Sequence, residues 1–324
     1  MINKLSLVIS DGTDPRRNLA LESALMASVR KNEMILYLWQ NDNTVVIGRN
    51  QNVRKECNLT NIRKDGVTIV RRPSGGGAVY HDLGNQNYTF LCASGNYDVS
   101  RQTAVICRAL AEAGIRAEIS GRNDILVNGR KISGNAYYHH NGCSYQHGTL
   151  LVCSDLSKMP AYLNPDPGKL KAKGVDSVRS RVMNLSEVKP DLTPELLRNL
   201  LVKACEEVYG LHAEERPQPD PEVFADYLRM FTSDEWTYGH EPGSGYTAEH
   251  RFSWGSVQLE LQIRKNIIHD VHIWSDSMEP DVIAGIPERL RGCEFSGRKM
   301  ADRLSQDAES AILCDIAEWL KEWE

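Results

Sequence analysis

Three consecutive glycines, at positions 75 to 77, separate two runs of residues typical of β-strands. Val67–Val70 precedes them, followed by Arg71 and Arg72, and Val79–His81 comes after them. Because glycine has no Cβ, the backbone can bend sharply here and its N–H groups can close around an anion. An arginine beside such a loop adds a forked, permanently charged ligand for phosphate or carboxylate. The segment predicts a loop that holds an anionic small molecule, although a plain glycine-rich hairpin has the same composition.

This loop does not follow the known nucleotide-binding patterns. No Gly-Lys-Ser or Gly-Lys-Thr follows the glycines, so it is not a Walker A loop. The dinucleotide fingerprint Gly-x-Gly-x-x-Gly opens a helix, whereas here the glycines lead into a predicted strand. An anion site of a different kind is therefore expected.

The length of 324 residues suggests two domains, and 41% hydrophobic with 25% charged residues is typical of a soluble globular protein. The net charge of −5 argues against general nucleic-acid binding, so no nucleic acid is expected as a partner. No apolar run is long enough to span a membrane, and the N-terminal apolar run is too short for a signal peptide. The eight cysteines form no Cys-x-x-Cys pair, so we expect reduced thiols in a cytoplasmic protein.

The hydrophobic pattern predicts an α+β fold. Helical spacing is found in residues 18–29, 103–113 and 194–209, and β-rich runs lie between them. Asn128-Gly129 is the strongest short signal for a hairpin with a type I′ turn. This order of elements favours a mixed or mainly antiparallel sheet over repeated βαβ units.

A second, smaller α+β domain is expected at the C-terminus. The proline- and glycine-rich residues 241–245 are the best candidate linker. We therefore predict one domain over residues 1–244 and another over 248–324. In the second domain, the pattern predicts three strands followed by two helices, over residues 251–254, 257–263, 267–274, 287–290 and 308–323.

Lys131 is the leading candidate catalytic residue. It follows the predicted turn, and Gly134 would allow a ligand to approach the strand closely. A lysine held beside an anionic ligand would offset negative charge during a reaction, although an exposed lysine is the more common reading. Asn123 and Asp124 can orient a ribose or hold Mg²⁺, but Asp124 can equally be just the first residue of a strand. For His139, His140 and His147, a surface or core position is favoured over a metal site.

Several of these segments together resemble the lipoate–protein ligase A family. The resemblance extends over nearly the whole chain, from Asp14-Pro15 to residues 252–255. Its main motifs lie in residues 71–85, 121–124, 130–134 and 173–181. It implies a large domain with mixed or antiparallel sheets and flanking helices, as in the biotin and lipoate ligases, plus a small α+β C-terminal domain.

The resemblance also implies an ATP-dependent lipoate–protein ligase. Lipoate and Mg-ATP would give lipoyl-AMP and pyrophosphate, and a lysine of an acceptor protein would then take the lipoyl group. The implied acceptors are the lipoyl domains of 2-oxoacid dehydrogenase acyltransferase subunits and the glycine cleavage H protein. The alternatives are a lipoyltransferase that uses preformed lipoyl-AMP or another lipoyl donor, octanoyl transfer from acyl carrier protein, and non-catalytic binding of lipoate or biotin.

The resemblance assigns roles to specific positions. Lys131 would contact both lipoate and nucleotide, and ATP or lipoyl-AMP would also contact Arg72, Gly77, Ala78, Val79 and Tyr80. The lipoate-binding loop would include Ser74, Gly75 and Gly76, with Pro73 removing one N–H donor from it. A basic flap between Lys169 and Arg181 would cover the adenylate through Lys173, Gly174 and Val175. From the residues alone, Val79 and Tyr80 can also be core strand residues, and the flap can be a solvated loop.

Overall fold

The computed structural model describes residues 1–121, 123–164, 181–239, 243, 245–306 and 310–323. Two compact units are distinguished by their internal contacts. The large unit comprises Met1–Val46, Arg54–Arg71 and Ala78–Thr237. The small unit comprises Ile47–Val53, Arg72–Gly77 and Tyr238–Glu324. The three glycines at positions 75 to 77 therefore belong to the small unit, whereas the strands on either side belong mainly to the large one.

An eight-stranded mixed sheet forms the centre of the large unit, in the order β11-β1-β2-β6-β10-β9-β8-β7. Strand β1 is parallel to both of its neighbours, and the pairs from β2 to β7 are antiparallel. In chain order the strands are β1 (Lys4–Ile9), β2 (Glu33–Trp39), β6 (Asn85–Ala93), β7 (Glu118–Ser120), β8 (Asp124–Val127), β9 (Arg130–His140), β10 (Cys143–Leu151) and β11 (Ala213–Glu215).

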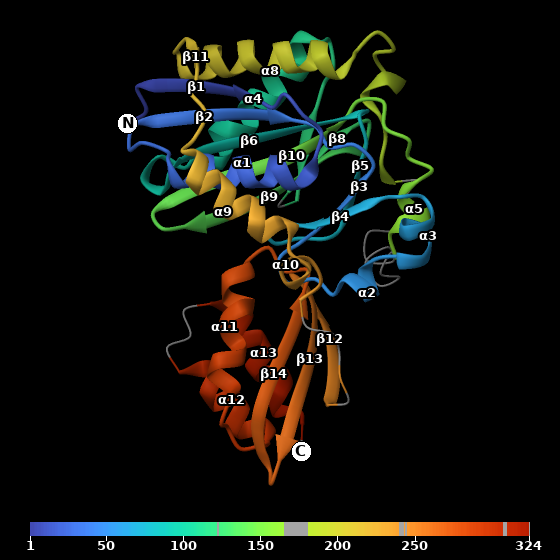
Figure 1. Ribbon diagram of the computed structural model, residues 1–324, viewed down its shortest axis with the longest axis vertical. Coiled ribbons are helices and arrows are strands. Elements are labelled where there is room, and N and C mark those ends of the chain that lie inside the picture. Colours follow the sequence, from blue (N-terminus) through green and yellow to red (C-terminus); the bar gives the residue numbers. More distant parts are fainter. Residues whose placement is uncertain (122, 165–180, 240–242, 244, 307–309, 324) are drawn as a thin grey trace. The chain divides into compact units, whose positions relative to one another are not determined.

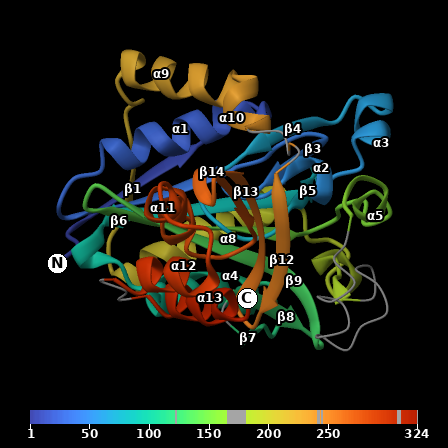
Figure 2. The same cartoon turned by 90° about the horizontal axis from the view of Figure 1, so that it is seen from below.

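Helices cover both faces of this sheet (Figure 1). Helices α4 (Val99–Glu112) and α8 (Pro194–Tyr209) pack on one face through residues such as Ile106 and Leu201. Helix α1 (Pro15–Ala27) packs on the other face, and α9 (Pro221–Thr232) packs against α1 from outside, with Phe231 fully buried (Figure 2). The helices expected over residues 18–29, 103–113 and 194–209 are confirmed as α1, α4 and α8. Apolar spacing gives α4 and α8 one buried face each, whereas α1 is buried on all sides from Asn18 to Met26.

A second sheet of the order β4-β3-β5 contains the strands on either side of the glycines. These are β3 (Thr44–Ile47), β4 (Thr68–Arg71) and β5 (Val79–His81), so the predicted strand–loop–strand arrangement is confirmed. The remaining short elements of the large unit are α2 (Val53–Glu56), α3 (Leu59–Lys64), α5 (Met159–Tyr162), α10 (Asp234–Tyr238) and the 3₁₀ turns η1 (Ser94–Asn96) and η2 (Leu185–Glu187).

The small unit packs three helices against one face of a three-stranded antiparallel sheet (Figure 2). The strands are β12 (Tyr246–Phe252), β13 (Gly255–Arg264) and β14 (Ile267–Ser275). The helices are α11 (Pro280–Leu290), α12 (Gly297–Ser305) and α13 (Ala311–Lys321). The strands predicted over residues 257–263 and 267–274 are confirmed as β13 and β14. The strand predicted over residues 251–254 is misplaced, because β12 begins at Tyr246 and ends at Phe252, where the turn into β13 begins.

The start predicted for the helix over residues 287–290 is wrong. Helix α11 begins at Pro280, and Pro287 lies inside it. A proline in a helix interior removes one backbone hydrogen bond, which is why the sequence favoured a start there. The side chains of Ile283, Ile286 and Leu290 are completely buried in the core of the small unit, and their packing outweighs that loss. Helix α12 was not predicted.

The α+β class is thus confirmed, with a mixed sheet and flanking helices in the large unit and a sheet with three helices in the small α+β unit. Within the described ranges, no helix combines the length and the apolar character needed to cross a membrane. All eight cysteines lie in these ranges and carry free thiols.

Candidate functional site

A β-bulge in strand β9 determines where the side chain of Lys131 points. The strand begins after a turn in which Asn128 has φ +51° and Gly129 has φ +73°, as a type I′ hairpin requires. Ser133 pairs with Ile125 but Lys131 pairs with Leu126, so Ile132 is an extra residue on this strand. The predicted hairpin is confirmed, and the bulge within it was not foreseen.

The bulge moves Lys131 to the sheet face on which Gly134 lies. In a regular strand, alternation would place Lys131 on the opposite face, with Ser133 and Asn135. Instead, a Cβ added to Gly134 would lie 2.7 Å from Lys131 Nζ, so the lysine extends directly over this glycine. Gly134 therefore leaves room for the lysine itself, and the close approach of a ligand to this glycine stays a prediction.

Asp124 holds the amine of Lys131 in this position. Its Oδ1 lies 2.7 Å from Lys131 Nζ, and its Oδ2 accepts a hydrogen bond from the guanidinium of Arg181. The side chain of Asp124 is 11% exposed, so both ion pairs are partly shielded from water. Asp124 is also the first residue of β8, as the alternative interpretation of the sequence predicted. Two cations around one carboxylate leave a net positive charge, which suits an anionic ligand.

The described residues offer little of their own to a metal ion. They contain no cluster of three or more His, Cys, Asp or Glu side chains that could hold one. Asp124 forms an ion pair with Lys131, and its two oxygens already face Lys131 and Arg181. Mg²⁺ often binds through one or two carboxylates plus substrate phosphates, so this arrangement suits a Mg²⁺ brought mainly by the nucleotide.

A buried polar group that the sequence did not reveal lies between α1 and the same face of the sheet. The completely buried Glu22 accepts a hydrogen bond from Thr89 Oγ1 at 2.6 Å, and its Oε1 lies 3.0 Å from His147 Nδ1. Trp39 Nε1 donates to the same threonine at 3.0 Å. A glutamate among buried leucines and alanines of helix α1 was the available signal, because an isolated buried carboxylate is costly.

Arg72 shapes the glycine loop in this structure. Its Nη2 donates to the carbonyl of Gly75 at 2.7 Å and to that of Gly77 at 2.9 Å, and its Nε donates to Ser74 Oγ at 3.0 Å. The arginine is 6% exposed. The guanidinium thus connects Ser74, Gly75 and Gly77 by hydrogen bonds and restricts the conformation of the loop. The contact of Arg72 with a phosphate stays a prediction.

Two further backbone features determine the path of this loop. Gly76 has φ +88°, which favours glycine, and its N–H donates to the carbonyl of Ser277 at 3.0 Å. A Cβ on Gly48 would lie only 2.2 Å from the carbonyl oxygen of Gly76, so only glycine fits at position 48. The sequence analysis missed Gly48, although a glycine directly after strand β3 was a usable signal.

Ala78, Val79 and Tyr80 continue from the loop into the large unit. Val79 pairs with Val46 in the ladder between β3 and β5. The side chain of Tyr80 is 2% exposed and its hydroxyl donates to Asn43 Oδ1 at 3.1 Å. Tyr80 is thus a core strand residue, which leaves the inferred contact of its main chain with nucleotide as a prediction.

Arg71 anchors the strand before the loop to helix α10. Its Nε donates to the carbonyl of Trp236 at 2.9 Å and its Nη2 to that of Thr237 at 2.8 Å. In return, Trp236 Nε1 donates to the carbonyl of Arg71 at 2.8 Å. Burial lowers the pKa of Arg71 to about 10, so the side chain remains charged at neutral pH.

The structure therefore brings together Lys131, Asp124 and Arg181 in the large unit, with Asn123 next to Asp124. Separately, it gathers Arg72, Ser74, Gly75, Gly76 and Gly77 in the small unit. The inferred flap residues Lys173, Gly174 and Val175 lie outside the described residues.

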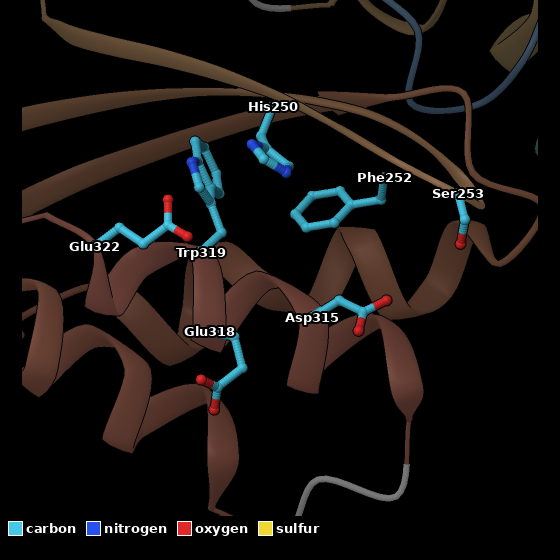
Figure 3. Close-up of a pocket in the computed structure, with 7 residues that line it drawn as sticks. All are labelled: His250, Phe252, Ser253, Asp315, Glu318, Trp319 and Glu322. Carbon is cyan, nitrogen blue, oxygen red and sulfur yellow. The ribbon is translucent and has the colours of Figure 1, made fainter. Parts of the chain in front are cut away.

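A surface recess in the small unit contains none of these predicted residues (Figure 3). Rings of His250, Phe252 and Trp319 line it, and the ring centroids of His250 and Trp319 are 5.3 Å apart. Ser253 and the carboxylates of Asp315, Glu318 and Glu322 complete the lining. Within the same unit, the carboxylate of Asp315 accepts a hydrogen bond from Trp254 Nε1, and that of Glu318 accepts one from Lys321 Nζ.

Comparisons with known proteins agree with this architecture. Residues 14–206 match the model of the lipoyl protein ligase A/B catalytic domain. Residues 241–320 match the bacterial lipoate protein ligase C-terminus. The catalytic-domain match includes the glycine loop, Asp124, Lys131 and Arg181.

Solved structures similar to this chain include LipL1 of P. falciparum, in complex with lipoate. It is 29% identical, with 98% of this chain and 99% of that chain covered and a TM-score of 0.87. The bipartite lipoate protein ligase of Thermoplasma acidophilum, studied with its E2 lipoyl domain, is 27% identical with a TM-score of 0.63, covering 75% of this chain and 99% of that one. A lipoate-protein ligase A bound with ATP is 27% identical with a TM-score of 0.62, covering 74% and 99%.

The catalytic-domain match covers more than half of the chain, and the C-terminal match covers most of the rest. The protein therefore belongs to the lipoate–protein ligase family.

Proposed function

We propose that this protein joins lipoate to acceptor proteins in two steps, activation by ATP and transfer from lipoyl-AMP. The observation that carries the proposal is the placement of Lys131. The bulge puts its amine over Gly134, and Asp124 Oδ1 holds it at 2.7 Å. A fixed ammonium is the group needed where negative charge accumulates between a carboxylate and a phosphate.

In the first step, an oxygen of the lipoate carboxylate attacks the α-phosphorus of ATP, and pyrophosphate leaves. Lys131 offsets the negative charge that both reactants bring to the reacting centre. Asp124 reduces the mobility of the amine, so little reorganisation is needed when the substrates bind. Mg²⁺, held mainly by the phosphates, would neutralise the departing pyrophosphate.

In the second step, the neutral amine of an acceptor lysine attacks the carbonyl carbon of lipoyl-AMP. The bond to AMP breaks, the amine loses a proton, and an amide forms. The net positive group of Lys131, Arg181 and Asp124 suits the single negative charge of the adenylate phosphate. No covalent enzyme intermediate is required.

The glycine loop would hold the acyl substrate and the nucleotide phosphates. Gly75 and Gly76 would allow close approach, and Arg72 would keep the loop in shape or contact a phosphate directly. Ala78, Val79 and Tyr80 would contact the nucleotide through main-chain groups, since the Tyr80 side chain is buried.

The proposed acceptors are the lipoyl domains of 2-oxoacid dehydrogenase acyltransferase subunits and the glycine cleavage H protein. The similarity to the Thermoplasma system, which was studied with its E2 lipoyl domain, supports the first of these. Free thiols at all eight cysteines support a reducing, cytoplasmic setting.

The direct test is pyrophosphate release that depends on lipoate, measured with purified full-length protein and Mg-ATP. The same samples are then given an acceptor lipoyl domain, and lipoylation is followed by intact-mass spectrometry. We expect pyrophosphate release, and then acceptor modification with AMP as a product. Control reactions omit lipoate or ATP, or use a Lys131→Met variant.

The result also separates the alternatives. Acceptor modification only when lipoyl-AMP is supplied, without pyrophosphate release from ATP, would replace our proposal with a lipoyltransferase. Binding of lipoate with neither reaction would indicate a non-catalytic binder and refute both enzymatic assignments.

A further inference from the structure

A buried polar network lies on the opposite face of the sheet from Lys131, beneath helix α4. Its centre is Asn135 of strand β9, which is 6% exposed. Asn135 Oδ1 accepts hydrogen bonds from Tyr88 Oη at 2.5 Å and from Gln146 Nε2 at 2.9 Å. Tyr88 and Gln146 are both completely buried. The large majority of buried polar groups in native proteins are hydrogen-bonded, and these hydrogen bonds hold Asn135 in a defined orientation.

The same asparagine makes three hydrogen bonds with Asn123. The backbone N–H of Asn135 donates to the Asn123 carbonyl at 2.8 Å, and its Nδ2 donates to that carbonyl at 3.3 Å. Asn123 Nδ2 donates back to the Asn135 carbonyl at 3.2 Å. Asn123 directly precedes Asp124, whose carboxylate holds Lys131.

The network fixes which way the Asn135 amide points. The Asn123 carbonyl oxygen can only accept a hydrogen bond, so the end of the Asn135 amide that faces it is the NH₂ group. The oxygen end then accepts from the Tyr88 hydroxyl and from Gln146 Nε2. A flipped amide would place two oxygens together at the Asn123 carbonyl.

Gly148 of strand β10 provides the space for this arrangement. A Cβ at this position would lie 2.4 Å from Tyr88 Oη and 2.9 Å from Asn135 Oδ1. Only glycine allows both polar groups to meet here, so the pairing depends on a residue from a third strand.

We propose that Asn135 is a positioning residue for Lys131, acting through Asn123 and Asp124. The inference rests on the role proposed above for Lys131. Asn135 holds the backbone at Asn123, and this places the carboxylate of Asp124 where it meets the amine. Tyr88 and Gln146 hold Asn135 in turn. The buried network of Asn135, Tyr88 and Gln146 on one face of the sheet thereby determines the positions of Asp124 and Lys131 on the other face.

The proposal is tested with Asn135→Ala and Tyr88→Phe in the full-length protein. Asn135→Ala removes the amide and leaves the Tyr88 hydroxyl and the Gln146 amide without this acceptor. Tyr88→Phe keeps the ring and removes one of the two donors that orient Asn135. Gln102→Met is the matched control, because Gln102 is completely buried on the same side of the sheet and donates instead to Cys92 Sγ, at 4.0 Å.

Kinetics of lipoate-dependent pyrophosphate release give the first readout. We expect Asn135→Ala to lower kcat about 10- to 100-fold while KM for ATP and lipoate changes about threefold or less, because a misplaced group weakens the transition state more than substrate binding. Tyr88→Phe should give a smaller loss in kcat. Gln102→Met should keep kcat within about twofold of the unmodified protein after correction for the folded fraction.

The second readout is independent of activity. The ¹⁵N signal of the Lys131 ammonium group, assigned by its loss in Lys131→Arg, reports directly on the contact with Asp124. We expect this signal to shift or broaden in Asn135→Ala and to stay unchanged in Gln102→Met. If Asn135→Ala does not fold, Tyr88→Phe provides the same comparison with the core volume nearly preserved.

The two outcomes that overturn the proposal are distinct from failure of the proposed function. An unchanged Lys131 signal in folded Asn135→Ala or Tyr88→Phe shows that the network does not position the amine, whatever the activity. A drop in kcat equal to that of Gln102→Met shows a general stability effect and likewise refutes it. If Lys131→Met retains full pyrophosphate release, the catalytic role of Lys131 fails, while the ammonium signal still decides whether Asn135 positions it.

Discussion

Replacing Gly134 with alanine would test whether the exact position of the Lys131 amine matters for catalysis. The new Cβ would lie 2.7 Å from Lys131 Nζ and 3.0 Å from Cε. Gly134 has no positive φ, so alanine introduces no backbone strain. The substitution therefore acts almost entirely on the end of one flexible side chain.

The size of the displacement follows from the geometry. To restore ordinary contact at 3.4 Å, the amine must retreat by about 0.7 Å, and this moves it relative to Asp124. Because a misplacement of about 1 Å can cost on the order of 100-fold in rate, we expect kcat for lipoate activation to fall about 10- to 100-fold. That loss corresponds to about 1.4–2.7 kcal/mol of transition-state stabilisation. The free energy of unfolding should change by about 1 kcal/mol or less, since the displaced atoms can move.

The assay is lipoate-dependent pyrophosphate release, with kcat and KM determined separately and stability measured by urea unfolding. Gly95→Ala is the matched control, because no heavy atom lies within 4 Å of a Cβ there and φ is not positive. We expect the control to behave like the unmodified protein in both measurements.

A double-mutant cycle with Lys131→Met provides the decisive comparison. If Gly134→Ala acts through the lysine, it should have no further effect on the rate once the amine has been removed. A normal kcat in Gly134→Ala, or an equal loss in both backgrounds, would refute the reasoning.

The remaining predictions concern three charged side chains: Lys131, Arg72 of the glycine loop, and the buried Glu33. Lys131→Met should lower pyrophosphate release by about 100-fold or more and leave the circular dichroism spectrum unchanged, and activation at the normal rate would exclude the lysine from the chemistry. Arg72→Ala should weaken ATP binding in titration calorimetry without changing acceptor affinity, and an unchanged ATP affinity would count against our assignment of the loop. Glu33→Gln should lower the free energy of unfolding by about 1–3 kcal/mol at pH 7. Burial opposes the charge on Glu33, but hydrogen bonds from Ser6, Arg30 and Arg216 and the charge of Arg216 together lower its pKa below the usual 4.5. The stability that ionised Glu33 contributes is fully present above its unfolded-state pKa and is lost as the pH falls through its folded-state pKa. The free energies of unfolding of the Glu33→Gln variant and the unmodified protein should therefore converge in acid. A difference between the two proteins that widens as the pH falls through the acid range would contradict this account.

The sequence predicted the local features of the fold well. The helices α1, α4 and α8 follow from apolar spacing, and the turn at Asn128-Gly129 follows from the ease with which these residues adopt positive φ. Helix α11 shows where this approach fails, because burial of side chains in the small unit outweighs the local preference of Pro287.

The candidate site was predictable in its residue types but not in its geometry. Lys131 and Asp124 stood out by their places beside a turn and at the start of a strand. Arg181 was foreseen only as part of a basic run, and its pairing with Asp124 joins residues 57 positions apart. Glu22 and His147 are 125 positions apart and carry no shared sequence signal.

By itself, the sequence determined that this chain forms strands on either side of a glycine-rich loop, a hairpin that carries Lys131, and a family-specific set of motifs. These depend on local backbone preferences and on the chemistry of individual residues. Only the tertiary structure decided that a one-residue bulge turns Lys131 to the face of Gly134 and that Asp124 meets it there. The physical reason is that side-chain alternation along a strand reverses at each bulge, and whether a bulge forms depends on pairing with the neighbouring strand and not on the strand's own residues.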